Sequence, residues 1–205
     1  MTAVPMFVAL QPDRELTQFL NDCKSRTQEM VGDQLYLGDP PHLTLYLAAF
    51  ENPERVIDEL SILTLPTITG ELVGWHVFEA DVLTGRNTLV CEIDAADKGK
   101  LRQVQAALIR RLAPLRDVSA TLERYKGKLN NLSKERQKAV ERVGFPFVGD
   151  DWQPHFSVGS ILPKDWPPVW NELESLSPKR AFSCPQLKLY RLEGTHPVLV
   201  NTFDL

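Results

Sequence analysis

The chain has 205 residues, which is enough for one sizeable domain, or for one domain built from two similar halves. Its net charge of −4 excludes a general attraction to nucleic acid, so a polyanion would have to be met by a local patch. Cys23, Cys91 and Cys184 lie far apart without a CxxC spacing, which indicates reduced, buried thiols rather than a disulfide framework or a zinc site. The sequence shows neither an export signal nor a stretch that could span a bilayer, so we expect a cytoplasmic monomer without membrane contact.

Strands and helices alternate in the first half of the chain, residues 1–84. Short apolar runs predict buried strands, and apolar positions repeated at intervals of three and four predict helices. Asp13 and Asn52 each stand where a helix N-cap is expected, and Asn52 is followed by Pro53. The expected elements are a strand at 6–10, a helix at 13–30, a strand at 42–50, a helix opening at 53, and extended segments at 67–73 and 75–83.

The second half, residues 85–205, repeats this order. Its expected elements are a strand at 88–93, a helix with apolar positions from 101 to 112, a strand at 155–161, a helix opening at 167, and a strand pair at 186–192 and 198–203. Each half therefore reads as strand, helix, strand, helix, strand pair. Such an internal repeat predicts a single bilobal α+β domain with a pseudo-twofold axis, in which the two middle strands can lie side by side.

The second half is longer because it holds an insertion at about residues 116–144. The insertion contains eight basic side chains against four acidic ones. Its apolar residues from 118 to 132 predict one helix, and Ser133 would cap a second helix that runs to Val143. One interpretation is a solvated helical hairpin. The other is a basic flap beside the site, in which residues such as Lys126 and Lys128 would meet substrate phosphates.

One short pattern recurs in the repeat. Residues 41–44 and 154–157 both read proline, histidine, any residue, hydroxyl. Alternate side chains of a strand share a face, so each motif would present one imidazole and one hydroxyl together, with the apolar residue between them facing the other way. The distance from the motif histidine to the proline that opens the next helix is 11 residues in the first half (42 to 53) and 12 in the second (155 to 167). This agreement ties both motifs to the repeat.

Two imidazoles across a groove can divide acid and base catalysis, because histidine alone titrates near neutral pH without help. In-line displacement at phosphorus needs a base on the entering oxygen, an acid on the leaving oxygen, and donors for the equatorial oxygens. His42 and His155 would supply the base and the acid, and the hydroxyls of Thr44 and Ser157 would bind the phosphoryl oxygens. This scheme needs no metal ion or other cofactor, and the sequence holds neither a GxxxxGK loop nor an HExxH motif.

On these two motifs the chain resembles the two-histidine (2H) phosphoesterases, which include the RNA 2′,3′-cyclic phosphodiesterases formerly called 2′-5′ RNA ligases. The resemblance extends from the strand at 7–10 to the final strand pair and leaves the insertion outside. It implies two antiparallel sheets flanked by helices around a central groove. It also implies metal-independent hydrolysis or transesterification of 2′,3′-cyclic phosphates or 2′-linked phosphodiesters in RNA ends or nucleotides. For hydrolysis it assigns His155 to activating water and His42 to protonating the leaving sugar oxygen.

Other functions and contacts stay open on the sequence. The same fold could bind a nucleotide or RNA without turnover, it could act on cyclic nucleotides or oligonucleotides, or the two motif histidines could ligate a metal. Trp152 stands where it could stack on a base, and Tyr190 and Arg191 where they could reach a phosphate. We interpret His76 and His196 as structural. His76 has no hydroxyl residue two positions later, and His196 stands at a turn before a proline.

Overall fold

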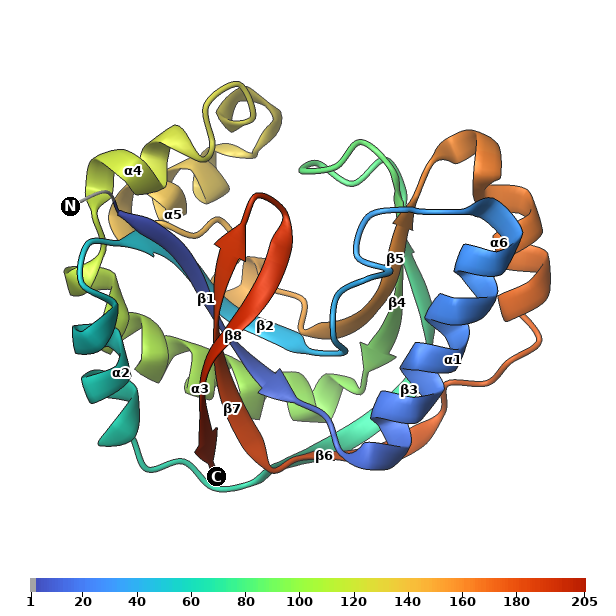
Figure 1. The fold of residues 1–205 in the computed structure, drawn as a ribbon, viewed down its shortest axis with the longest axis horizontal. Helices are drawn as coiled ribbons and strands as arrows, with labels where there is room; N and C mark the ends of the chain where they lie inside the picture. Colours follow the sequence, from blue (N-terminus) through green and yellow to red (C-terminus); the bar gives the residue numbers. More distant parts are fainter. Residues whose placement is uncertain (1–2) are drawn as a thin grey trace.

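The computed structural model describes residues 3–205 as two four-stranded antiparallel sheets with helices packed against them (Figure 1). The strands are β1 (Val4–Gln11), β2 (Leu43–Phe50), β3 (Ile68–Phe78), β4 (Asn87–Ile93), β5 (His155–Ile161), β6 (Arg180–Cys184), β7 (Gln186–Glu193) and β8 (His196–Asp204). The α-helices are α1 (Arg14–Val31), α2 (Pro53–Ser61), α3 (Ala95–Leu112), α4 (Val118–Glu123), α5 (Lys134–Val143) and α6 (Trp166–Leu173). The predicted α+β architecture with two antiparallel sheets is confirmed.

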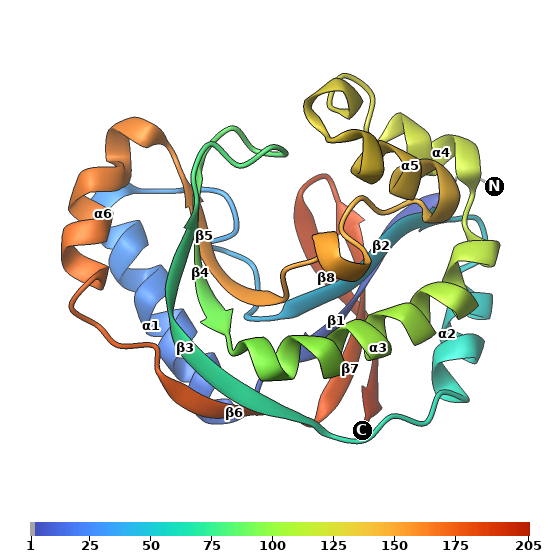
Figure 2. The same cartoon turned by 180° about the vertical axis from the view of Figure 1, so that it is seen from behind.

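The two sheets exchange strands between the halves of the sequence. Their strand orders are β2-β1-β7-β8 and β5-β4-β3-β6. Strand β3, which closes the first half, pairs with β4, and β7, near the end of the second half, pairs with β1. The motif strands β2 and β5 each form the edge of a sheet, and they contact each other in the middle of the molecule (Figure 2). Each lobe in space is therefore built from both halves of the sequence.

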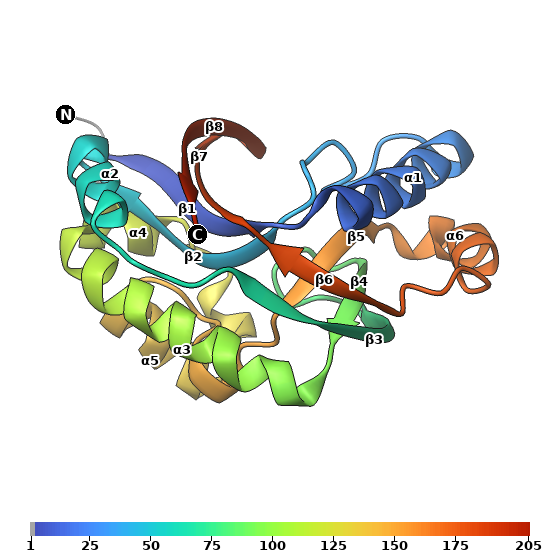
Figure 3. The same cartoon turned by 90° about the horizontal axis from the view of Figure 1, so that it is seen from below.

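Helices α1 and α2 begin directly after their predicted caps. The side chain of Asp13 accepts a hydrogen bond from the Leu16 amide at 2.9 Å, and that of Asn52 accepts one from the Arg55 amide at 3.3 Å. Figure 3 shows α1 and α6 together at one end of the molecule and α2 and α3 at the other. Apolar faces of these helices close a continuous core with both sheets, and each fully buried leucine in it contributes about 1.5–3 kcal/mol.

The prediction of two separate extended segments at 67–73 and 75–83 is wrong, because the structure has one strand in this region. Residues 68–78 form the single strand β3, whose first part pairs with β6 and whose second part pairs with β4. The register shifts between Leu72 and Gly74, so the glycine marks a bulge and not the end of a strand. The short strand β6, which pairs with the first part of β3, was not predicted.

The first helix of the insertion is also shorter than predicted. It ends at Glu123, and Gly127 follows with a φ of 77°, a left-handed conformation that favours glycine and interrupts the helical pattern. The second helix is confirmed: the Ser133 hydroxyl accepts from the Arg136 amide at 3.3 Å, and the helix ends before Gly144, whose φ is 83°.

The three cysteines are buried and unpaired, as predicted. Burial raises the pKa of the Cys23 thiol to about 11, which keeps it protonated and unreactive. Among the helices of residues 3–205, none combines the length and the apolar character that crossing a bilayer requires.

Candidate active site

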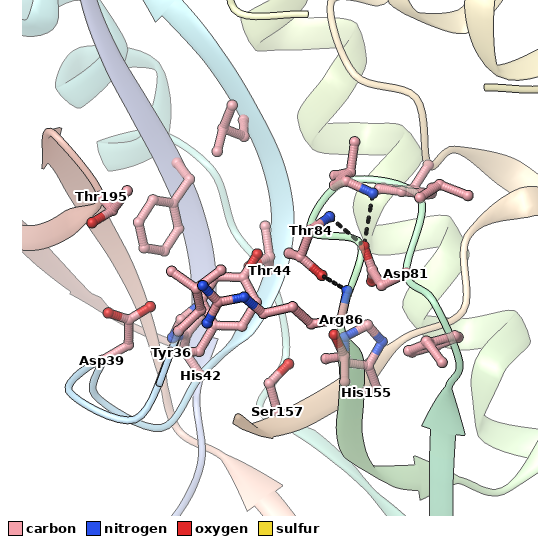
Figure 4. A pocket seen from close by; sticks show the side chains of 18 of the residues that line it. Tyr36, Asp39, His42, Thr44, Asp81, Thr84, Arg86, His155, Ser157 and Thr195 are labelled. Atoms are coloured by element: carbon pink, nitrogen blue, oxygen red, sulfur yellow. Dashed lines mark hydrogen bonds between the residues drawn. The ribbon is translucent and has the colours of Figure 1, made fainter. Parts of the chain in front are cut away.

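The two motifs lie at the N-terminal ends of β2 and β5. His42 directly precedes β2, and His155 is the first residue of β5. The residues between histidine and hydroxyl, Leu43 and Phe156, are fully buried in the core. Both imidazoles and both hydroxyls line one groove of about 950 Å³, where Figure 4 shows the His42 motif and the His155 motif on opposite sides. The structure therefore brings together the four residues that the repeat singles out.

Both motif strands carry a bulge directly after the hydroxyl residue. Against β1 the register skips Leu45, which follows Thr44. Against β4 it skips Val158, which follows Ser157. A bulge bends its strand and re-aims the neighbouring side chains, and bulges are frequent beside active sites. The backbone thus repeats the same irregularity at the same position of each motif.

Each motif imidazole is held through one ring nitrogen. Nδ1 of His42 lies 2.7 Å from the Pro40 carbonyl oxygen, and Nδ1 of His155 lies 2.7 Å from that of Gln153. A carbonyl oxygen can only accept, so Nδ1 carries the hydrogen in both rings and the lone pair of the neutral form lies on Nε2. Both histidines therefore offer Nε2 as a base when neutral and as an acid when protonated.

The charges around the two imidazoles differ. Burial lowers the pKa of His42 to about 4; the hydrogen bond to the Pro40 carbonyl opposes this shift, and the Lys24 ammonium contributes to it. Burial also lowers the pKa of His155, but the Asp81 carboxylate opposes this effect. These neighbouring charges make His155 the member of the pair that is easier to protonate in the free protein.

The family model of the 2′-5′ RNA ligase superfamily matches residues 12–196. The chain belongs to this superfamily. Among solved structures, TT0787 of Thermus thermophilus is similar over 98% of this chain and 97% of its own, with a TM-score of 0.58 and 17% identity. E. coli LigT, solved with NADP+, is similar over 100% of this chain and 99% of its own, with a TM-score of 0.56 and 12% identity. None of the curated protein sequences matches the chain significantly.

These findings confirm the resemblance to 2H phosphoesterases that rested on the two motifs. Membership of the superfamily supports a phosphodiesterase or RNA-processing function. At 12–17% identity the solved structures establish the fold alone.

An aromatic ring that also lines the groove lies beside each motif imidazole. The ring of Phe7 lies 5.1 Å from that of His42, and the ring of Phe78 lies 5.1 Å from that of His155. Tyr190, which the sequence suggested as a phosphate contact, is instead 3% exposed and stacks on Phe7 at 4.9 Å. Tyr190 is not among the residues that line the groove, and its ring centroid lies 6.2 Å from that of His42.

The other suggested substrate contacts differ in whether they line the groove. Trp152 and Lys128 line the groove, although Trp152 is only 4% exposed. Arg191 lies outside the groove lining and pairs with Glu193 at 2.6 Å. Lys126 also lies outside it and pairs with the last residue of α4 at 2.8 Å. Of the five suggested contacts, only Trp152 and Lys128 face the groove.

Three groove residues were not expected from the sequence. Arg86, in the turn between β3 and β4, extends toward Tyr36 on the α1–β2 loop, and its Nη1 lies 3.4 Å from the Gln34 amide oxygen (Figure 4). His76 and His196, which were interpreted as structural, also line the groove. No local pattern marks these three positions, because the turns and strand ends that carry them meet only in the folded chain.

Proposed function

We propose that the protein is a metal-independent phosphodiesterase that acts on 2′,3′-cyclic phosphates or 2′-linked phosphodiesters of RNA ends or nucleotides through two-histidine acid-base catalysis. One observation carries the proposal. Two contacting strands each present an imidazole, fixed through Nδ1 to a backbone carbonyl, together with a hydroxyl in one groove. The superfamily to which the chain belongs supports the same class of reaction.

In the proposed hydrolysis of a cyclic phosphate, the neutral imidazole accepts a proton from water through Nε2 while the water oxygen attacks phosphorus. The bond between phosphorus and one sugar oxygen breaks, and the second, protonated imidazole donates its proton to that oxygen. The product is a phosphomonoester with a free sugar hydroxyl. The two imidazoles end with exchanged protonation states, and proton exchange with solvent restores them.

The groups around the histidines suit the charge that develops in this step. Thr44 and Ser157 can donate to the non-bridging oxygens, and the Arg86 guanidinium lines the same groove between the motifs. A bound phosphate anion also favours the protonated form of a nearby imidazole, which opposes the burial that lowers the pKa of both histidines. Substrate would therefore help to create the acid that the reaction needs.

The two hydroxyls should matter less than the histidines. We expect Thr44→Val and Ser157→Ala each to lower kcat/KM by about 10²-fold to 10³-fold, as is typical when one donor to a charged oxygen is lost. Steady-state kinetics would measure this loss, with Thr69→Val as the control for a strand threonine outside the groove. Unchanged kinetics in both hydroxyl variants would remove these residues from the site.

A panel of substrates tests the proposed reaction directly. We expect release of nucleoside monophosphates from 2′,3′-cyclic nucleotides, with the same rate in the presence of EDTA, because the mechanism uses no metal. Capped RNA ends and cyclic oligonucleotides complete the panel, and the nucleotides found with E. coli LigT, which include 3′-AMP and ATP, are suitable ligands for binding controls.

Two results of this panel would replace the proposal. Tight binding of nucleotides without any turnover would indicate a binding module of the same fold. Loss of activity with EDTA and its return with a divalent metal would indicate a metal hydrolase that uses the motif histidines as ligands.

A further inference from the structure

The flap, which we define as residues 116–144, places cationic side chains on one wall of the groove. Arg124, Lys128 and Arg136 all line the groove from this segment. Figure 2 shows α4 and α5 beside β2, across from the turn between β3 and β4. The flap is therefore part of the groove wall.

The flap is anchored to the sheet that carries the first motif. The Ala49 amide on β2 donates to the Thr121 hydroxyl at 3.0 Å, and the Tyr46 hydroxyl donates to the Val143 carbonyl at 2.5 Å. The flap also has a small core of its own, made of Tyr125, Leu132 and Val140. Leu83, from the β3–β4 turn, packs against this core. Contacts to β2 on one side and to the turn on the other hold the cationic side chains in place relative to the motifs.

Two arginines of the flap, Arg124 and Arg136, lack partners that would occupy all their donors. Nε of Arg124 and Nε of Arg136 are buried without a hydrogen-bond partner. Within residues 3–205, no carboxylate forms an ion pair with Arg124. Arg136 lies over the Phe147 ring at 5.1 Å, and its Nε is 3.7 Å from the Asp151 carboxylate, a distance too long for a hydrogen bond. Burial lowers the pKa of Arg124, as expected for a desolvated cation that lacks an anion.

Two other arginines also have a buried, unpaired Nε, but they differ in position. Arg102 pairs with Asp150 at 3.1 Å, and Arg180 lies over the Phe19 ring at 3.9 Å. Neither lines the groove. Of these four arginines, only Arg124 and Arg136 combine an unpaired donor with a position in the groove lining.

The charged residues that line the groove differ between its two sides. The flap and the segment that follows it contribute the three cations and one carboxylate, Asp151. The opposite side, formed by α1, the α1–β2 loop and the β3–β4 turn, contributes more carboxylates than cations. Its charged residues are Lys24, Asp39, Glu79, Asp81 and Arg86. An anion away from the motifs would therefore be favoured on the flap side.

We propose that the flap wall is a second phosphate-binding subsite, which takes a phosphate group of the substrate other than the reacting one. This inference rests on the proposed function, because it extends the same groove. A guanidinium suits a phosphate, since its planar donors match two oxygens at once. The groove volume of about 950 Å³ is near the upper end of the 300–1,000 Å³ that ligand pockets usually have, which leaves room beyond the reacting phosphate. The second phosphate could belong to the next nucleotide of an RNA chain or to the 5′ position of a single nucleotide.

Binding to unreactive ligands tests the subsite without depending on turnover. The probes are 3′-AMP, with one phosphate, adenosine 3′,5′-bisphosphate, with two on one nucleotide, and a triribonucleotide 3′-phosphate without a 5′-phosphate. Calorimetry would compare the wild type with Arg124→Gln, Arg136→Gln and the control Lys138→Gln, which removes one charge from a position of α5 outside the groove. Arg124→Lys keeps the charge and tests whether the planar donors matter.

We expect each arginine variant to weaken binding of at least one two-phosphate or chain ligand by about tenfold or more, the loss typical of a hydrogen bond to a charged group, and to change 3′-AMP binding less than about twofold. For the triribonucleotide, the slope of log affinity against log salt should become shallower by about 0.7 for each phosphate contact removed. A loss confined to the bisphosphate assigns the subsite to a 5′-phosphate, and a loss confined to the triribonucleotide assigns it to an RNA chain.

Equal losses for all three ligands would overturn the inference, because they would indicate a general disturbance of the groove. Unchanged binding in both arginine variants, with unfolding temperatures like that of the wild type, would overturn it too. Turnover that survives loss of the motif histidines would instead overturn the proposed function and leave this binding comparison valid.

Discussion

His42→Ala and His155→Ala should each abolish measurable turnover while the fold stays intact. General acid or base catalysis contributes about 10²-fold to 10⁴-fold, and neither imidazole can perform both proton transfers of one turnover. Each ring is only partly buried and faces the groove, so its removal takes little from the core. The double variant should resemble either single variant, because an acid and a base that act in one step are not additive.

Steady-state kinetics on a 2′,3′-cyclic nucleotide, with thermal unfolding as the measure of fold, would check this expectation. Lys138→Ala provides the comparison, because this exposed residue of α5 lies outside the groove and its loss should cost far less activity. Near wild-type rates in either single motif variant, in a preparation that is free of wild-type protein, would show that the two-histidine mechanism is wrong.

The features predicted correctly from the sequence are those that local pattern determines. The caps at Asp13, Asn52 and Ser133 each depend on a side chain and an amide three residues on. The two motifs follow from the alternation of a strand, and Leu43 and Phe156 are buried as that alternation requires. The repeat added the information that the two motifs belong together, which a single motif does not contain.

The features that sequence did not predict depend on contacts between distant segments. The exchange of β3 and β7 between the sheets follows from packing of the whole core, and either half alone gives no sign of it. The bulges at Leu45 and Val158 lie within apolar runs, where each residue would suit an unbroken strand equally well. Arg86 belongs to a turn whose direction is set by the strands on both sides. Its approach to the motifs is therefore a property of the folded chain.

The pH dependence of the proposed reaction should differ between free protein and complex. Burial lowers the pKa of both histidines, so in the free protein the fraction with one protonated imidazole falls as pH rises above the lowered pKa. We therefore expect kcat/KM to follow a bell whose alkaline limb lies below the ordinary histidine pKa of about 6.5. The bell for kcat should lie at higher pH, because the bound phosphate raises both pKa values, which belong to the pair rather than to either residue.

A substrate whose leaving group needs no proton, such as a nitrophenyl phosphodiester, should restore activity to one histidine variant and not to the other. The variant that lacks the acid is rescued, because nitrophenolate leaves unaided, whereas the variant that lacks the base still cannot activate water. The resemblance to 2H phosphoesterases assigns the acid to His42 and so predicts rescue of His42→Ala. The charges near the rings favour the reverse, since Lys24 disfavours a proton on His42 and Asp81 favours one on His155. The identity of the rescued variant decides between these assignments, and the alkaline limb of the wild-type bell should vanish with this substrate. Rescue of both variants, or of neither, would contradict the division of labour between the two imidazoles.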